Sequence, residues 1–441
     1  MTVAATFQVP LCDPLVGEEY PTALASRIAS RFDAPRPLEA FDFPDKGNIN
    51  QHTFLIVGGR QPCTREYLLQ RINQQVFTRP ETVMSAMVAC LETQRRSLAR
   101  GVLPAGREWD TIQLVSTLDG KPYLEFENLR GKTHWRLMVK IPECRTYKSL
   151  SEVSSREEQL LLAEEAGRGL AIYGDLTADM DISGLVSPLP GYRDTRVYFA
   201  QLQSVLQGNR TLNQAEPLLP RDPVVRQSTE QHFLVHIPPE EHRRRVEDPD
   251  LRHFIELARN EEIFGTTLLK EMEAARIRTV AIHGDTKLDN FLFSQQTGKV
   301  KALVDLDTIM PHTWLADWGD MARSLANVAG EKERNLARVL VDMGIYEAIA
   351  RGFLSTARKI TGAEVALMTE AVEIIALELG IRFMTDYLRG NSYFKLAPTD
   401  PPDLNKVRGM VQLTLFERLR DNAAEARRCI ARFSPFGCTA R

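Results

Sequence analysis

This 441-residue chain has two parts with different residue patterns, and this division constrains its fold more than any single motif. Between residues 46 and 141, short runs of β-branched and aromatic residues alternate with turn sequences such as GG, DGK and RGK, which is typical of antiparallel strands. One segment in this part, residues 80–100, begins with proline and repeats apolar residues at helical spacing. The expected order is therefore two strands, one helix and three strands, with the strands in NINQHTFLIV, REYLLQRIN, TIQLVSTL, PYLEFE and THWRLMVKI.

After residue 141 the strand patterns nearly stop and long amphipathic helices are predicted. They cover residues 156–174, 196–207, 250–275, 369–388 and 404–433. The sequence IPECRTYKSL, near 141–150, is the candidate junction between the two parts. The prediction is an α+β protein with two domains, residues 1–143 and 144–441. The first holds a five-stranded antiparallel sheet with one helix, preceded by a Pro- and Ala-rich leader with a short helix near Thr22–Arg31.

Composition excludes several classes of protein. The net charge is −3, and the densest basic run, Arg243–Arg245, is flanked by four acidic residues, so no nucleic-acid partner is expected. Apolar residues never run together for about 20 positions, so no membrane partner is expected. The six cysteines form no C-x-x-C pair, which argues against a zinc or redox site. We expect a cytoplasmic protein that is a monomer or a weak homo-oligomer.

The sequence HGDTKLDN, residues 283–290, is the strongest functional signal. Taken alone, it could be a charged surface turn. It lies, however, between two short apolar runs, TVAI and FLF, and the strand-like VKALVDLDT follows after the turn SQQTGK. These segments predict a small hairpin platform that holds acidic side chains at the ends of rigid strands, which suits chemistry.

The spacing within this platform matches the requirements of phosphoryl transfer. A carboxylate must accept the proton of the attacking hydroxyl, oxygen ligands must hold magnesium, and positive charge must neutralise the transferring phosphoryl. His283, Asp285 and Asn290 have the spacing of a kinase catalytic loop, and Asp305 ends the next strand, where a metal-binding Asp is needed. Asn290 and Asp305 offer the oxygen ligands that magnesium prefers. His283 is predicted to support the loop from a buried position, and Asp289 to face solvent.

The segments HGDTKLDNFLF, VKALVDLDTIMP and LADWGDMARS resemble the aminoglycoside phosphotransferase and choline kinase group, small-molecule kinases with a protein-kinase-like, bilobal fold. Within that group, GNINQHTFLI, THWRLMVKIPECRTY, YRDTR and RFMTDYLRGNSYFK look like N-acetylhexosamine 1-kinase and its relatives. The resemblance runs from about Gly47 to Lys395. It implies a nucleotide-binding first lobe, a helical second lobe that carries the catalytic loop and the substrate pocket, and ATP and Mg²⁺ as cofactors.

The resemblance also assigns roles to individual residues. Asp285 becomes the catalytic base, Lys287 steadies the phosphoryl group, and Asn290 and Asp305 ligate magnesium. Asp317 and Asp320 resemble acids that brace the catalytic loop, although a helix-capping role is an equal alternative. The remaining assignments are Gly47, Asn48 and Asn50 in a loop over the nucleotide or sugar, Arg71 at the nucleotide phosphates, and Asp307, Arg382 and Tyr393 on the substrate side.

Some positions depart from the pattern of the relatives. Asn48, Tyr192-Arg193 and His312 replace a histidine, a phenylalanine-histidine pair and a glycine, all on the expected substrate side. The acid that would pair with Arg71 is not evident; Glu81 and Glu92 are candidates, but either is also a plausible surface residue. Arg382 lies in an amphipathic helix pattern and could also be a surface cation, although the family pattern favours a ligand role.

Three functions follow from these observations. The first is an ATP-dependent kinase of a small molecule, with the anomeric hydroxyl of a sugar such as an N-acetylhexosamine as the acceptor. The second keeps the chemistry and changes the acceptor to an amino-alcohol, an aminoglycoside or a natural-product intermediate, for which acidic or aromatic groups would be needed. The third is a nucleotide-binding pseudokinase without turnover, and the presence of Asp285, Asn290 and Asp305 together argues against it.

Overall fold

The computed structural model describes residues 21–44, 49–50, 52–128, 131–394 and 396–437. The chain forms two compact units, Met1–Leu91 with Asp110–Pro142 and Glu92–Trp109 with Glu143–Arg441. The predicted division at residue 143 put residues 92–109 into the first domain, whereas the structure groups them with the second unit. The reason is a pair of ionic contacts within that unit, from Arg107 to Glu165 at 2.7 Å and from Arg100 to Asp179 at 3.2 Å.

The first unit contains an antiparallel sheet in the order β1-β2-β3-β6-β4, in which β5 also pairs with β6. Five of these strands were predicted, and the sixth, β1, was not, because it falls in the segment interpreted as a leader. β1 is an edge strand with mostly exposed side chains, so its hydrophobic pattern is weak. The bounds are β1 Leu38–Asp42, β2 Thr53–Gly58, β3 Arg65–Arg71, β4 Gln113–Val115, β5 Leu124–Asn128 and β6 Gly131–Val139.

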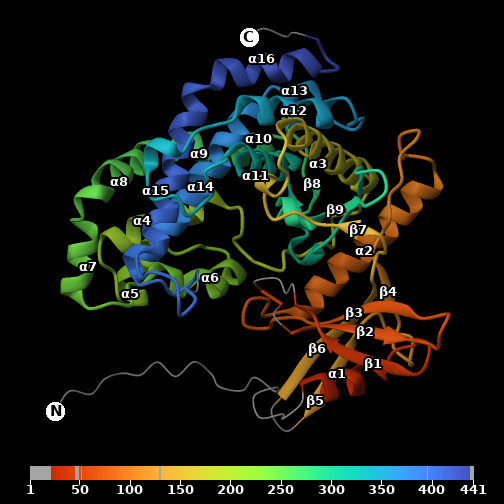
Figure 1. Cartoon of the computed structure of the whole chain (residues 1–441). Coiled ribbons are helices and arrows are strands. Elements are labelled where there is room, and N and C mark those ends of the chain that lie inside the picture. Colours follow the sequence, from red (N-terminus) through yellow and green to blue (C-terminus); the bar gives the residue numbers. More distant parts are fainter. Residues whose placement is uncertain (1–20, 45–48, 51, 129–130, 395, 438–441) are drawn as a thin grey trace. The chain divides into compact units, whose positions relative to one another are not determined.

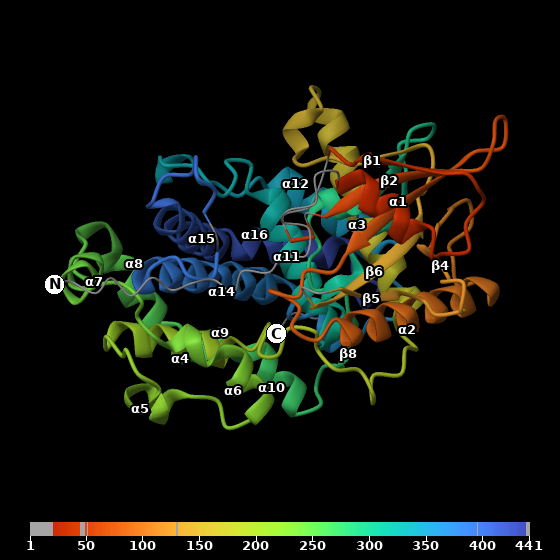
Figure 2. The ribbon, with the colours of Figure 1, turned by 90° about the horizontal axis from the view of Figure 1, so that it is seen from below.

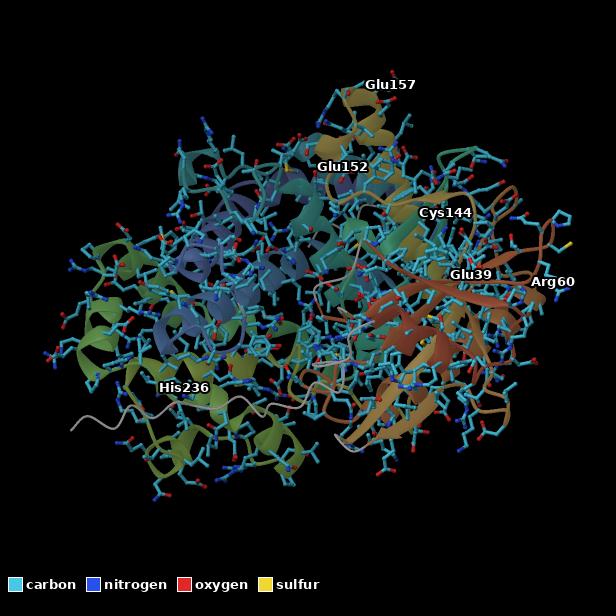
Figure 3. The ribbon with its side chains drawn as sticks, turned by 60° about the horizontal axis from the view of Figure 1, so that its bottom comes forward. Glu39, Arg60, Cys144, Glu152, Glu157 and His236 are labelled. Atoms are coloured by element: carbon cyan, nitrogen blue, oxygen red, sulfur yellow. The ribbon has the colours of Figure 1, made fainter. Side chains whose placement is uncertain are left out.

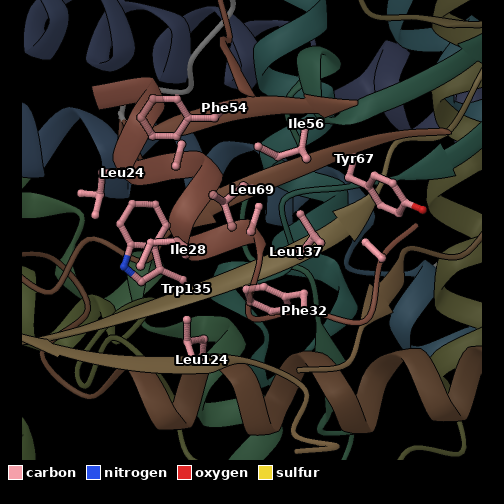
Figure 4. Packing of buried hydrophobic residues seen from close by; sticks show 13 residues of the cluster. Leu24, Ile28, Phe32, Phe54, Ile56, Tyr67, Leu69, Leu124, Trp135 and Leu137 are labelled. Carbon is pink, nitrogen blue, oxygen red and sulfur yellow. The ribbon is translucent and has the colours of Figure 1, made fainter. Parts of the chain in front are cut away.

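Helix α1, Pro21–Ala29, packs against one face of this sheet, as Figure 4 shows. Alternate residues of the strands point toward the helix because side chains of a strand alternate between its two faces. The shared core consists of Leu24, Ile28, Phe32, Phe54, Ile56, Tyr67, Leu69, Leu124, Trp135 and Leu137, with three alanines of the helix and the turn that follows it. The predicted second helix is α2, Pro80–Ala99.

The second unit is mainly helical (Figure 1). Helix α14, Met368–Arg389, lies between α15 and α4, as Figures 1 and 2 agree. The longer helices are α3 Arg156–Thr177, α4 Thr195–Leu206, α8 Pro249–Asn260, α11 Trp314–Ala326, α12 Met343–Leu354, α15 Leu404–Asp421 and α16 Ala423–Phe433; the shorter ones are α5 Leu212–Ala215, α6 Pro223–Thr229, α7 Pro239–Val246, α9 Glu262–Gly265, α10 Thr267–Glu273 and α13 Gly362–Val365.

Two predicted helices are interrupted in the structure. The segment 250–275 forms α8, α9 and α10, and the segment 404–433 forms α15 and α16. The second break lies at Asn422, whose side-chain amide donates to the carbonyl of Arg418 at 2.8 Å and so ends α15 with a local hydrogen bond. Glu152, in the 3-10 helix Leu150–Glu152 before α3, and Glu157, in the first turn of α3, are exposed on the surface (Figure 3). Within the described ranges, no helix has the length and apolar character needed to cross a membrane.

Two small antiparallel sheets carry the polar motif of the second unit. β8, Val280–Ile282, pairs with β11, Met310–His312, and β9, Phe291–Ser294, pairs with both β10, Val300–Leu303, and β7, Cys144–Arg145. The predicted hairpin is therefore confirmed as β9 and β10. The loops that leave β8 and β10 contain the candidate catalytic residues.

Candidate active site

The HGDTKLDN motif forms the loop between β8 and β9. Gly284 turns this loop with a φ of +86°, and a Cβ at this position would stand 2.7 Å from the carbonyl oxygen of Thr308. His283 is fully buried, and its Nε2 lies 2.8 Å from the carbonyl oxygen of Val304. This histidine supports the loop through the backbone, as the sequence predicted, while Asp289 is exposed.

Asp317 of α11 holds the loop through hydrogen bonds to its backbone. Its two carboxylate oxygens accept hydrogen bonds from the backbone N–H groups of His283, at 2.7 Å, and Gly284, at 2.8 Å. Burial raises the pKa of Asp317, and these backbone N–H donors oppose that rise. The residue that caps α11 is Thr313, so of the two roles open from sequence the structure selects bracing for Asp317.

The backbone brings the three predicted oxygen-bearing residues together. The side-chain amide of Asn290 donates to the carbonyl of Asp285 at 2.7 Å and lies 3.4 Å from its carboxylate. The N–H of Val304 donates to the carbonyl of Asn290 at 2.9 Å, and the carbonyl of Val304 contacts His283. Asp305 follows directly, exposed and with a left-handed φ of +64°. The loop and the end of β10 therefore present Asp285, Asn290 and Asp305 as neighbours.

Lys287 supplies the positive charge of this group. Its Nζ lies 2.9 Å from Oδ2 of Asp285. Burial lowers the pKa of Lys287, but the carboxylates of Asp285, Asp289 and Asp305 outweigh burial and raise it above its ordinary value. With its ion pair to Asp285 and its raised pKa, the ammonium group of Lys287 stays charged at neutral pH.

Asp307 lies in the short 3-10 helix Leu306–Thr308 that follows Asp305. Its side chain is buried, with 3% exposed. The same turn is tied to the catalytic loop because the hydroxyl of Thr308 donates to the carbonyl of His283 at 2.7 Å. Asp307 is thus buried where Asp305 is exposed, and its predicted substrate role stays a prediction.

A second cluster joins Arg382 of α14 to aromatic side chains. Its guanidinium carbon lies 5.1 Å from the ring centre of Tyr192 and 4.9 Å from that of Tyr198, and its Nη2 lies 3.4 Å from Oη of Tyr393. Among the residues that the structure describes, no carboxylate lies within ion-pair distance of Arg382. The predicted substrate-side residues Arg382 and Tyr393 are thus neighbours, and aromatic faces surround the cation. The other rings near this guanidinium are those of Tyr393 and Phe394.

The predicted nucleotide-side residues belong to the first unit. Gly47 and Asn48 lie outside the described residues. Asn50 is buried, and its Oδ1 accepts a hydrogen bond from the N–H of Asn73 at 3.0 Å, which fixes the end of its loop. Arg71 ends β3, and its Nη2 lies 3.0 Å from Nδ1 of His52.

Neither of the acids considered as partners of Arg71 is buried. Glu92 is exposed, and so is Glu81, whose carboxylate lies 3.6 Å from the guanidinium of Arg79. Both therefore have the exposure of surface residues, and the nucleotide-phosphate role of Arg71 stays a prediction.

A family model described as "Phosphotransferase enzyme family" matches residues 43–338, which is more than half of the chain. The chain belongs to the phosphotransferase enzyme family. The matched range includes strands β2 to β6 of the first unit and the whole catalytic loop, so the family assignment and the geometry of the loop concern the same residues.

One solved structure of low sequence identity shares the fold of this phosphotransferase. A microcompartment-associated aminopropanol kinase matches with a TM-score of 0.54 at 12% identity, covering 92% of this chain and 98% of the other. Weaker matches include an ethanolamine kinase from Plasmodium vivax, with a TM-score of 0.44, 11% identity and coverage of 86% and 81%, and the choline kinase LicA from Streptococcus pneumoniae, with a TM-score of 0.40, 10% identity and coverage of 91% and 98%.

These findings establish the class of the enzyme. It is an ATP-dependent phosphotransferase that acts on a hydroxyl group of a small molecule. The predicted α+β, kinase-like fold and the superfamily are confirmed, with six strands in place of five. The predicted closeness to N-acetylhexosamine 1-kinase is not among these findings and stays a prediction.

Sequence reasoning missed a buried ionic group behind the loop. Arg193 is 3% exposed and pairs with Glu378 of α14 at 3.0 Å and with Asp320 of α11 at 3.1 Å. Arg323 also contacts Asp320, and these two arginines lower the pKa of Asp320 to about 2 against the opposing effect of burial. These residues are far apart in sequence, and the sequence signals were the Tyr-Arg pair that departs from the relatives and Asp320, which resembles an acid that braces the loop.

Proposed function

We propose that this enzyme transfers the γ-phosphoryl group of ATP, with magnesium, to a hydroxyl of a small oxygen-rich acceptor, and that this acceptor is a sugar such as an N-acetylhexosamine phosphorylated at its anomeric hydroxyl. The observation that supports it best is that Asp285 contacts both Asn290 and Lys287. Asp305 lies next to this group, because the residue before it, Val304, bonds to the carbonyl of Asn290. Use of ATP as the donor also favours a cytoplasmic location.

Asp285 is the base in this proposal. Its carboxylate takes the proton from the acceptor hydroxyl as the acceptor oxygen bonds to the γ-phosphorus and the bond from that phosphorus to the β–γ bridging oxygen breaks, which releases ADP. The ion pair with Lys287 holds a positive charge beside Asp285 and beside the phosphoryl oxygens. Asp317 and Asn290 both bond to this part of the backbone and thereby orient the base.

Asn290 and Asp305 have the chemistry of a magnesium site. Their candidate donors are one amide oxygen and one carboxylate, the hard oxygen ligands that magnesium prefers, and no sulfur or imidazole ligand is placed among them. The amide nitrogen of Asn290 bonds to Asp285, so the amide oxygen is the atom left to face a cation. When bound, magnesium neutralises the charge that develops on the phosphates.

The surroundings of Arg382 support an oxygen-rich acceptor over a cationic one. The nearby acids are already paired, Glu378 with Arg193 and Asp386 with Arg389. A charged guanidinium without a carboxylate partner repels an ammonium group and donates hydrogen bonds to hydroxyl or carbonyl oxygens. The aromatic rings of this cluster lie against the Arg382 guanidinium, so the amino-alcohol and aminoglycoside alternatives need acidic or aromatic groups outside this cluster of described residues.

A ³¹P NMR assay with ATP and magnesium tests the proposal across three acceptor groups: N-acetylhexosamines, neutral hexoses, and cationic amino-alcohols or aminoglycosides. The expected result is a sugar 1-phosphate signal that grows with ADP in equal amounts and only when an acceptor is present. Phosphorylation confined to the cationic group would overturn the sugar assignment and retain the kinase. ATP hydrolysis without transfer to any acceptor, or no ³¹P product signal with any acceptor, would contradict both the sugar assignment and the kinase activity.

A further inference from the structure

Two consecutive residues outside the catalytic motif hold the peptide that precedes the base. The hydroxyl of Tyr192 donates to the carbonyl oxygen of Gly284 at 2.9 Å, and Nη2 of Arg193 donates to the same oxygen at 3.2 Å. That carbonyl belongs to the peptide that joins Gly284 to Asp285. Two donors therefore converge on one atom that is adjacent to the base.

The opposite side of the same glycine is also fixed. The N–H of Gly284 donates to Asp317, so each of the two successive peptide units of this glycine is bonded to a side chain. Because the planes of both peptide units are fixed, the backbone on either side of Gly284 cannot rotate freely. The direction in which the side chain of Asp285 leaves the loop is therefore restricted as well. The N–H of the Gly284–Asp285 peptide also donates to Nδ1 of His283 at 3.3 Å, so Tyr192 and Arg193 act together with this contact to restrict rotation about ψ of Gly284.

Arg193 is itself held firmly. Its guanidinium is buried between Asp320 and Glu378. Its backbone N–H donates to Oη of Tyr198 at 3.1 Å, and its backbone has a left-handed φ of +63°. A non-glycine residue in that conformation persists only where the surroundings fix it, and such positions concentrate at functional sites. The carboxylates of two helices thus fix Arg193 where it reaches Gly284.

Tyr192 also faces the substrate side. Its ring lies 5.1 Å from the guanidinium carbon of Arg382, while its hydroxyl reaches the catalytic loop. Burial raises the pKa of Tyr192 to about 12, so the hydroxyl remains protonated and donates at neutral pH. One side chain therefore contacts both the proposed acceptor-side cation and the backbone of the base.

We propose that Tyr192 and Arg193 are positioning residues that fix the Gly284–Asp285 peptide and so aim the base at the acceptor hydroxyl. The inference rests on the proposed role of Asp285 as the base. The hydroxyl of Tyr192 acts on the loop, and its ring supports Arg382, so the two parts of this side chain affect different kinetic constants. Removal of the hydroxyl lowers kcat, and removal of the ring in addition raises the acceptor KM.

Steady-state kinetics of Tyr192→Phe, Tyr192→Leu and Arg193→Lys test this proposal. Tyr192→Phe is expected to lower kcat about 3- to 10-fold with acceptor and ATP KM within about 2-fold, as expected for one lost hydrogen bond. Tyr192→Leu is expected to raise the acceptor KM as well. Arg193→Lys keeps the charge but loses the planar fork, so kcat is expected to fall further. Tyr346→Phe, which removes another buried tyrosine hydroxyl, is the matched control and should keep wild-type kinetics.

A double-mutant cycle separates positioning from a general structural effect. If Tyr192 acts through the base, Tyr192→Phe lowers activity in the wild-type enzyme and causes no further loss in an Asp285→Asn background. An equal loss in both backgrounds, or wild-type kcat for Tyr192→Phe, overturns the inference. Should Arg193→Lys fail to fold, the Tyr192→Phe cycle still decides the question. Full activity of Asp285→Asn alone would instead refute the proposed function itself.

Discussion

The side-chain amide of Asn290 donates a hydrogen bond of 2.7 Å to the backbone carbonyl of Asp285, five residues earlier in the chain. The proposed metal ligand therefore helps to hold the proposed base. Because the amide nitrogen makes this bond, the orientation of the amide oxygen toward a cation is set by the same contact. Base position and metal position are coupled through one residue, and changes at Asn290 should affect both.

Asp285→Asn is expected to lower kcat by about 10³-fold, because a carboxamide cannot accept the proton of the attacking hydroxyl and general bases contribute about 10²- to 10⁴-fold. Binding of ATP, measured by isothermal titration calorimetry, should change little. Asp289→Asn is the matched control, since Asp289 belongs to the same loop but is exposed. Equal loss in both variants would assign the effect to the charge of the loop and not to a base.

Asn290→Ala is expected to raise the magnesium concentration that gives half-maximal activity by about 10-fold or more, the scale on which altered metal surroundings act. The variant loses the proposed ligand oxygen and the bond that orients Asp285, so kcat at saturating magnesium should fall too. A magnesium titration of the rate measures both effects. Unchanged magnesium dependence would exclude Asn290 as a ligand.

The sequence predicted regular elements and local motifs well because both depend on neighbouring residues. Five strands, helices α1 and α2 and the β9–β10 hairpin follow from apolar spacing and turn residues. The missed strand, β1, has too little apolar periodicity to be recognised, and the breaks near Glu261 and Asn422 depend on capping contacts within otherwise amphipathic stretches.

The candidate site was predicted only as far as its residues lie close in sequence. His283, Asp285, Lys287 and Asn290 share one loop, so their spacing carried the information. The contacts of Arg193 with Asp320 and Glu378 join residues more than a hundred positions apart, and no periodicity encodes them. Arg382 could have been a surface cation on its helix pattern, and its aromatic surroundings became evident only in the folded chain.

Arg382→Met is expected to raise the acceptor KM by about 10-fold or more, since loss of a charge-assisted hydrogen bond costs about 1.5–3 kcal/mol. The KM for ATP should stay close to the wild-type value. Initial-rate measurements with each substrate varied in turn distinguish the two constants. Improved phosphorylation of a cationic acceptor by this variant would support the view that the guanidinium excludes ammonium groups, and an unchanged acceptor KM would remove Arg382 from the acceptor site.

His312 should make the fold sensitive to acid. Burial, and then the charge of Arg193, lowers the pKa of His312 from 6.5 to about 4. The unfolded chain therefore binds a proton on His312 below pH 6.5, whereas the folded chain does not bind it until about pH 4. The unfolding free energy is thus highest above pH 6.5 and decreases as the pH falls. The loss amounts to about 1.4 kcal/mol per pH unit, or about 2 kcal/mol by pH 5.

Urea unfolding of the wild type and of His312→Leu across this pH range measures that loss. The difference in unfolding free energy between pH 7 and pH 5 should be smaller in the variant by about 2 kcal/mol. Between pH 7 and pH 8, above the ordinary pKa of histidine, the two proteins should respond alike. An identical acid response of both proteins would show that His312 does not stay neutral in the fold.

Gly352 lets helices α12 and α3 approach until their backbones touch. A Cβ at Gly352 would stand 2.0 Å from the carbonyl oxygen of Glu164, a backbone atom that cannot move without shifting α3. Gly352→Ala is therefore expected to destabilise the second unit by about 3 kcal/mol, the upper range of overpacking costs.

Gly174→Ala, within α3 but with no atom within 4 Å of its Cβ, should instead stabilise by about 1 kcal/mol because alanine favours helix. Urea unfolding followed by tryptophan fluorescence reports on this interface, since Trp314 stacks on Phe353 at 5.0 Å. Shifts of the same sign in both variants would contradict the close approach of the two helices.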